Sequence, residues 1–374
     1  MIIPNTLLTK VRVEGFRSLR NVTLDLAPIN VLIGPNGAGK SNLLTALRLP
    51  TIMRTQGLRL WVGEQGGASK LLHYGPETTS DLEIDLEFTE GSEHWGYEAR
   101  LRHAAGDKLV FAKELLSLQS DVRDGAVLDI GAGHDEAQMA TAQRPPHTLS
   151  KVAELVGGIG YFHFHNTSST SPLRQNSHSA EHQFLRPDGS NLATMLHRFK
   201  QTDHPDFQPA WKRIEGLVRR VAPFIKDLDA ALVAPHVPSS TLRLFWTDTR
   251  GYRFDAHDLS DGTLRALALI TALAQPASML PKLIVIDEPE LGLHPAALSL
   301  IASVMRSVAH YAQIIVSTQS TALLNEFEPD EVIVVEQDKG ESNFRRLDPV
   351  ALEGWLEEYS LSELYDKNVL GGRP

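Results

Sequence analysis

Short runs of alternating or clustered apolar residues open the chain. Three such runs, each bounded by Gly, Pro or Asn, predict strands at residues 7–16, 21–26 and 29–34. After Gly39 the apolar positions take helical spacing up to Leu47, which predicts a helix that ends near Pro50. The pattern therefore predicts that a strand becomes a helix across a glycine-rich loop.

The middle of the chain divides into an alternating part and a polar part. Residues 81–118 alternate between apolar and polar positions across short polar turns, which predicts an antiparallel meander and hence a β subdomain. Polar stretches at 120–150 and 166–190 predict long loops, with a short buried strand at 161–165 between them.

Two helices are predicted beyond these loops. The first covers 191–200 and is capped by Ser190 or Asn191; the second covers 205–225, ends near Pro223 and is amphipathic. Four cations lie away from the apolar stripe of the second helix: Lys212, Arg213, Arg219 and Arg220. This basic side is either a solvated face or a surface for nucleic-acid phosphates.

Strands and helices alternate again in the last third of the chain. Largely apolar strands are predicted at 282–287, 313–318 and 331–336, with a helix from Pro295 between the first two. Uninterrupted apolar runs are typical of parallel strands covered on both faces. The arrangement indicates an α/β fold.

Charge and cysteine content narrow the functional classes. The formal net charge is −10, which disfavours general coating of nucleic acid or of anionic membrane. The chain has no cysteine, so disulfides, thiolate metal sites and cysteine nucleophiles are excluded. No signal-peptide pattern and no apolar run long enough for a bilayer occur, so we expect a cytoplasmic protein that does not insert into a membrane.

The sharpest chemical signal is a phosphate-binding loop at residues 34–41, placed where a predicted strand meets a predicted helix. Glycines let successive backbone N–H groups point at phosphate oxygens, Lys40 neutralises phosphate charge, and the Ser41 hydroxyl can bind Mg²⁺. The expected nucleotide contacts are Gly34, Pro35, Asn36, Gly37, Ala38, Gly39, Lys40, Ser41 and Asn42. ATP and Mg²⁺ are the expected cofactors.

Two adjacent carboxylates follow the apolar strand at 283–286. Neighbouring residues at a strand end point in different directions, so one carboxylate can bind the metal while the other faces an attacking water. We assign Asp287 to Mg²⁺ and Glu288 to the general base.

A third element is Leu259-Ser260-Asp261-Gly262-Thr263, which precedes a helix. Together with the phosphate loop, the Asp287-Glu288 pair and the strand at 313–318, it resembles the ABC-type ATPase heads of the RecF, SMC and OLD class. The N-terminal segment 11–44 and the C-terminal segment 355–374 are similar to compact bacterial ATPases of the AAA-domain, OLD-like group. The resemblance implies an α/β P-loop NTPase fold of the ABC-head type, with an antiparallel β subdomain and a largely helical insertion.

This resemblance implies three segments and a dimer. Residues 1–119 would form an N-terminal ATPase lobe, 120–240 a loop-rich and helical insertion, and 241–374 a C-terminal ATPase lobe. In that family two heads enclose two ATP molecules, so Ser260 and Gly262 would contact the nucleotide bound by the second copy. A serine hydroxyl and backbone N–H groups at a helix N-terminus suit an anion, although an ordinary helix cap has the same sequence.

The family pattern also suggests roles for single residues. Gln319 stands where many ABC heads have a histidine; its amide can donate to a γ-phosphate but cannot take a proton, so it would sense phosphate. Residues 290–294 correspond to the segment that bridges the two sites of a dimer. The remaining family positions fall on Asn36 near the β–γ bridge, on Arg12 or Arg17 near the base, and on Gln56 or Gln65 for the glutamine that binds Mg²⁺.

The histidines at 163 and 165 could bind a metal from one strand face, but the sequence places no third ligand beside them, so packing is the simpler interpretation. The leading hypothesis is an ATP-driven switch that acts in DNA repair or phage defence with DNA or a separate effector protein. The alternatives are an ABC-transporter ATPase subunit, for which the stretch from Ser41 to Leu259 is much longer than a compact head needs, and a nucleotide-sensing scaffold without turnover.

Overall fold

The computed structural model describes residues 4, 6–120, 125–140, 147–233 and 241–372. Within them the chain packs as two compact units. Unit 1 comprises residues 1–160, 282–285 and 309–374, and unit 2 comprises 161–281 and 286–308. Strands β8 (Ile159–Phe162) and β13 (Leu283–Asp287) carry the chain from one unit to the other. The three segments expected from the sequence remain a prediction about domains.

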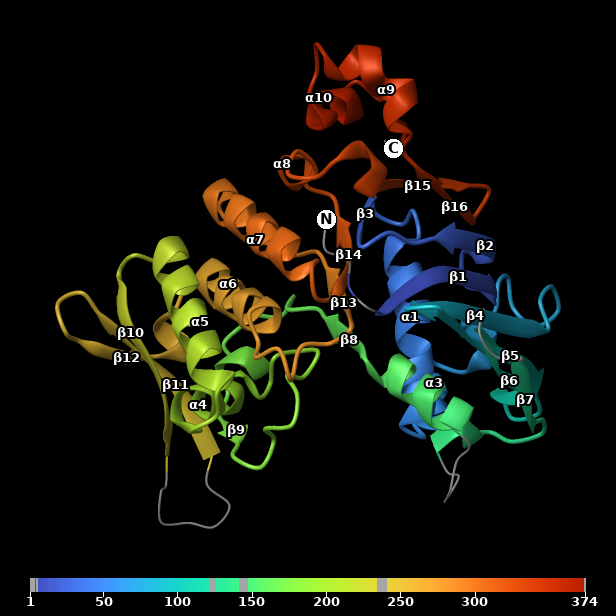
Figure 1. Cartoon of the computed structure of the whole chain (residues 1–374), viewed down its shortest axis with the longest axis horizontal. Coiled ribbons are helices and arrows are strands. Elements are labelled where there is room, and N and C mark those ends of the chain that lie inside the picture. Colours follow the sequence, from blue (N-terminus) through green and yellow to red (C-terminus); the bar gives the residue numbers. More distant parts are fainter. Residues whose placement is uncertain (1–3, 5, 121–124, 141–146, 234–240, 373–374) are drawn as a thin grey trace. The chain divides into compact units, whose positions relative to one another are not determined.

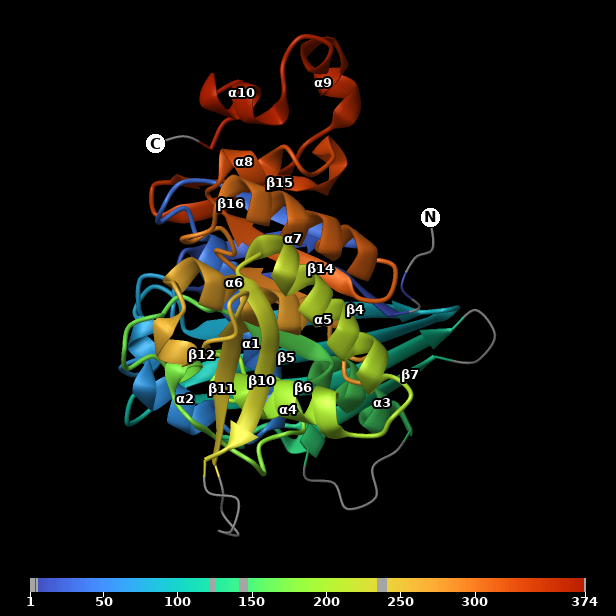
Figure 2. The ribbon, with the colours of Figure 1, turned by 90° about the vertical axis from the view of Figure 1, so that its left-hand side faces the viewer.

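An antiparallel sheet forms one part of unit 1, in the order β2-β1-β4-β5-β6-β7. Its strands are β1 (Thr6–Phe16), β2 (Leu19–Asp25), β4 (Asp81–Glu90), β5 (Glu93–Ala104), β6 (Lys108–Ser120) and β7 (Ala126–Gly131). Figure 2 shows the long strands β4 to β6 running side by side. The predicted meander is confirmed, and alternation buries Trp95 and Tyr97 on one face of the sheet. The sequence predicts a loop where β7 lies. The weakly apolar run forms a strand there because it pairs with β6.

The second sheet has the order β16-β15-β3-β14-β13-β8. Strand β3 (Ile29–Ile33) is parallel to both β14 (Gln313–Thr318) and β15 (Val332–Asp338), and β16 (Glu341–Arg346) returns antiparallel to β15. Every residue of β3, β13 and β14 is buried, as expected for parallel strands covered on both faces.

The helices of unit 1 are α1 (Lys40–Arg54), α2 (Leu58–Glu64), α3 (His147–Gly157), α8 (Thr321–Leu324), α9 (Pro349–Leu356) and α10 (Leu361–Asp366). Helix α1 does not stop at Pro50 as predicted but continues to Arg54. Pro50 and Met53 are both buried on the packed side of the helix, so tertiary packing outweighs the unfavourable helix propensity of proline.

Unit 2 contains the short sheet β10 (Ile225–Leu232), β11 (Thr241–Asp248) and β12 (Arg253–Asp255), with β9 (Ser177–His178) paired to β11. Its helices are α4 (Leu192–Gln201), α5 (Phe207–Val221), α6 (Asp261–Leu273) and α7 (Pro295–Val308). Helix α4 packs on this sheet, and α5 packs against both α4 and α6 (Figure 1). Both helices predicted at 191–200 and 205–225 are thus present. Across the described ranges, no helix combines the length and the apolar character needed to span a membrane.

Candidate functional site

The phosphate loop connects β3 to α1, as the sequence predicts. Gly37 and Gly39 have φ values of 82° and 108°, in the left-handed region that favours glycine. A Cβ at Gly39 would lie 1.9 Å from Ser342 Oγ, whereas one at Gly37 would face open space. The loop therefore needs glycine at 39 for both backbone conformation and close packing.

Lys40 begins α1 and is buried, with 5% of its surface exposed. Its ammonium donates to the carbonyl oxygens of Gly34 at 2.6 Å and Pro35 at 2.9 Å, so it lies across its own loop. Ser41 and Asn36 are exposed on the same loop. Lysine and hydroxyl are thus placed on one loop, as phosphate binding requires.

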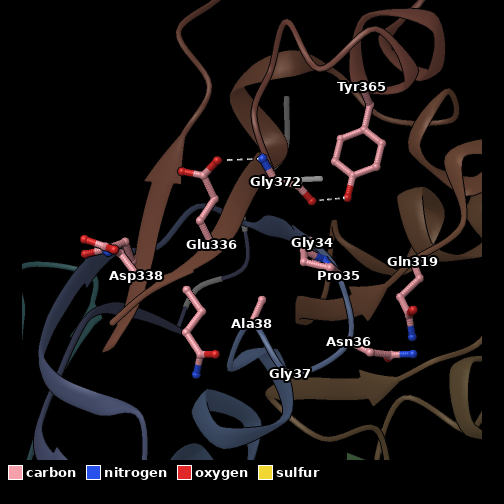
Figure 3. A pocket seen from close by; sticks show the side chains of 12 residues that line it. Gly34, Pro35, Asn36, Gly37, Ala38, Gln319, Glu336, Asp338, Tyr365 and Gly372 are labelled. Carbon is pink, nitrogen blue, oxygen red and sulfur yellow. Dashed lines mark hydrogen bonds between the residues drawn. The ribbon is translucent and has the colours of Figure 1, made fainter. Parts of the chain in front are cut away.

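A cavity of about 720 Å³ adjoins the outer part of this loop (Figure 3). It is lined by loop residues 34–38 together with Gln319, the end of β15 and part of the C-terminal segment. Glu336 accepts a hydrogen bond from Gly372 N at 2.6 Å, and the Tyr365 hydroxyl donates to Gly372 O at 2.5 Å. The C-terminal segment that carries the family resemblance therefore forms part of the wall of this cavity.

Asn42 and the two candidate glutamines have distinct surroundings. Arg17 donates to Gln65 Oε1 at 2.7 Å and to Asn42 Oδ1 at 3.4 Å, and burial lowers the pKa of Arg17. Gln56 instead donates to the Ala137 carbonyl. Gln65, but not Gln56, thus belongs to a network that reaches the first turn of α1.

Arg12 takes no part in that network. It lies on β1 and forms ion pairs with Glu14 at 2.6 Å and Glu83 at 3.4 Å. Of the two arginines suggested near the base, the structure brings Arg17 to the residues next to the phosphate loop.

The carboxylate pair ends β13. Asp287 is 6% exposed, and Tyr161 donates to its Oδ2 at 3.4 Å. Glu288 is half-buried and has a φ of 50°, a left-handed conformation that is uncommon for a residue with a side chain. Such local strain concentrates at functional sites.

The Leu259–Thr263 segment caps α6. The Ser260 side chain accepts from Thr263 N at 3.2 Å, so it serves as the N-cap, and it is exposed. A Cβ at Gly262 would lie 2.3 Å from Gly292 O, so this glycine permits close contact with the 290–294 segment. The two segments that the family places at the dimer interface therefore touch each other within unit 2.

Two arginines hold these segments in place. Arg174, 6% exposed, donates to the carbonyl oxygens of Thr167, Ala256 and Leu259 at 2.8, 2.5 and 3.0 Å. It also donates to Asp261 Oδ1 at 2.7 Å, and this hydrogen bond lowers the pKa of Asp261. The Leu259–Thr263 loop is thereby fixed from one buried guanidinium.

Arg265 lies near the N-terminus of α6 and donates hydrogen bonds to three backbone carbonyl oxygens. It donates to Leu291 O at 3.0 Å, to His165 O at 2.7 Å and to Phe164 O at 3.1 Å. The sequence does not predict the roles of Arg174 and Arg265. An arginine in a Ser/Thr-rich loop or on a helix surface usually has a solvated side chain, and its sequence context is the same.

The basic side of α5 is only partly available for binding. Arg213 donates to the carbonyl oxygens of Ala274 and Gln275 at 2.9 and 3.0 Å, and Arg219 pairs with Glu215 at 3.0 Å. Two of the four cations thus have structural partners within unit 2.

Solved structures share this fold at low sequence identity. An Smc head bound to the C-winged helix domain of ScpA matches with a TM-score of 0.58 and 15% identity, over 94% of this chain and 99% of that chain. An Smc head domain with an extended coiled coil, bound to the C-terminal domain of ScpA and derived from Pyrococcus furiosus, gives 0.55 and 14% over the same shares. Fold and motifs together define a P-loop ATPase head of the RecF, SMC and OLD-like ABC class.

A family model places the chain within this class. The chain belongs to the family described as "AAA domain, putative AbiEii toxin, Type IV TA system", whose model matches residues 29–325. The OLD nuclease of Thermus scotoductus (strain ATCC 700910 / SA-01) is 42% identical over 43 residues, which is 12% of this chain and 8% of that protein. The aligned part thus covers less than a tenth of that relative.

Proposed function

We propose that the protein is an ATP-hydrolysing switch in which two copies associate around ATP. The observation that carries the proposal is the pairing of two features: a phosphate loop in unit 1, and in unit 2 an exposed helix N-terminus at Ser260 that is locked by Arg174. Exposed donors at a helix N-terminus suit an anion, and a triphosphate held by a second copy would supply one.

The chemistry is in-line attack of water on the γ-phosphate. Lys40 offsets charge on the phosphates, Glu288 orients the water and accepts its proton, and Gln319 donates an amide hydrogen bond to the γ-phosphate. Ser260 and Gly262 of the second copy complete the contacts to that phosphate.

The donor set fits a magnesium ion. Ser41 and Asp287 offer a hydroxyl and a carboxylate, the hard oxygen ligands that Mg²⁺ takes alongside substrate phosphates. Held by these residues, the ion would offset the negative charge of the phosphates.

The biological role that we propose is in DNA repair or phage defence, with DNA or a separate effector protein as the partner. The short match to an OLD nuclease supports a DNA-related or defensive role. The Smc heads that share the fold were crystallised with domains of ScpA, which supports the idea of a partner protein. Association around ATP couples a small chemical event to a large change of shape that a partner can sense.

Two variants test the switch. Glu288→Gln is expected to retain ATP binding, to lower turnover by about 10²- to 10⁴-fold and to accumulate an ATP-bound dimer. Lys40→Ala is expected to lose nucleotide-driven association in sedimentation experiments. Unchanged turnover in the first variant, or an equal ATP-driven dimer in the second, contradicts the proposal.

A further inference from the structure

His163 lies beside the carboxylate assigned to the metal. It directly follows β8, and its Nδ1 atom is 3.7 Å from Asp287 Oδ2, the oxygen that also accepts from Tyr161. The sequence alone offered no acidic partner for this histidine. The fold supplies one from a strand more than a hundred residues away.

The imidazole is held in this position from several sides. The backbone N–H of His163 donates to Pro187 O at 3.0 Å, and its ring stacks nearly parallel on His165, with centroids 5.6 Å apart and planes 5° apart. The carbonyl of His165 is in turn bound by Arg265 at 2.7 Å. The backbone of both histidines is therefore held by hydrogen bonds, and one of these comes from the arginine that also binds Leu291 O.

The Nδ1 atom itself is buried and makes no hydrogen bond within the described residues. A buried ring nitrogen that faces a carboxylate without bonding to it is suited to share a cation with that carboxylate. Two ligands of one octahedral ion lie about 3 Å apart when each bond is ~2.1 Å, so a small rotation of either side chain closes the gap.

We propose that His163 is a ligand of the divalent ion that accompanies the nucleotide, together with Asp287. Imidazole binds Mn²⁺ and Co²⁺ better than Mg²⁺, so a histidine ligand would raise the affinity for these metals relative to that for Mg²⁺. No group of three or more His, Asp or Glu side chains able to hold an ion occurs among the described residues. Phosphate oxygens of the nucleotide would complete the coordination. This inference rests on the proposed function, because it requires nucleotide at the phosphate loop.

The test uses electron spin echo spectroscopy of Mn²⁺ bound to the full chain with a non-hydrolysable ATP analogue. Directly coordinated histidine nitrogen gives a characteristic modulation, and labelling the protein with ¹⁵N-histidine shifts it without any substitution. We expect this modulation in the wild type and in a control variant at an exposed histidine of the same unit, His182→Gln, and its loss in His163→Gln. The affinity for Mn²⁺ should fall about 10-fold or more in His163→Gln, while the affinity for Mg²⁺ changes by less than about 2-fold.

The outcomes separate this inference from the proposed function. Bound Mn²⁺-nucleotide without histidine modulation in the wild type, or modulation that persists in His163→Gln, overturns the assignment of His163 alone. A wild type that binds no metal-nucleotide complex overturns both.

Discussion

Replacing Arg174 with alanine tests whether one buried guanidinium fixes the Leu259–Thr263 loop. The substitution removes the guanidinium donors to the carbonyl oxygens of Thr167, Ala256 and Leu259, of which Ala256 O keeps the hydrogen bond from Leu259 N at 3.4 Å. A buried acceptor left without a partner costs about 1–3 kcal/mol, and water entering the vacated space recovers part of that. The Asp261 side chain is 60% exposed, so loss of its ion pair adds little.

We therefore expect the local free energy of opening to fall by about 2–4 kcal/mol. Since 1.4 kcal/mol corresponds to a factor of ten, amide hydrogen exchange across residues 256–264 should accelerate roughly 30- to 1000-fold. Hydrogen exchange with mass spectrometry measures this change in the region itself. Lysine in place of Arg174 should rescue only part of the protection, because one ammonium cannot reproduce the fork of the guanidinium.

Arg220→Ala provides the matched control. Arg220 is exposed on α5 in the same unit, and its removal should leave exchange at 256–264 unchanged. If Arg174→Ala exchanges as slowly as this control, the guanidinium does not hold the loop and the reasoning is refuted. If exchange accelerates but ATP-driven association is unaffected, the loop is ordered by Arg174 and has no role in the dimer.

Three further predictions concern other parts of the chain. Gly262→Ala should abolish ATP-driven association and preserve binding of a fluorescent ATP analogue, because the new Cβ would lie 2.3 Å from Gly292 O; normal sedimentation of the ATP-bound variant argues against this contact. Burial raises the pKa of Asp85 to about 6. Because the folded protein holds this proton more tightly than the unfolded chain, the free energy of unfolding of the wild type decreases as the pH rises from about 4 to about 6. Asp85→Asn should raise the free energy of unfolding by about 1–2 kcal/mol at pH 7, with allowance for the partial exposure of Asp85, and by little at pH 4. Urea unfolding measures both values, and an equal effect at the two pH values contradicts the assigned pKa. Tyr365→Phe removes the hydrogen bond to Gly372 O and should lower stability by about 0.5–1.5 kcal/mol, seen as faster hydrogen exchange at 365–372; unchanged exchange there rules out an anchoring role.

The local pattern of the sequence was enough to predict the phosphate loop and the strands around it. Alternation over 81–118 predicts the meander, and glycines between a buried strand and a helix predict the loop at 34–41, because both features depend on residues that are neighbours in the chain. The predicted end of the helix near Pro50 was wrong. Helix α1 continues to Arg54 because tertiary packing buries the side of the helix that carries Pro50, and local sequence does not show such packing.

Contacts across long separations were decided only by the tertiary structure. Arg174 reaches the 256–261 loop over more than eighty residues, and His163 reaches Asp287 over more than a hundred. Hydrophobic periodicity carries no information about which polar side chain a buried carbonyl or carboxylate will meet, because many arginines and histidines fit the same surface pattern. The sequence by itself thus determined which chemical groups the chain carries and where strands and helices form, whereas the packing of distant loops determined which of these groups face one another.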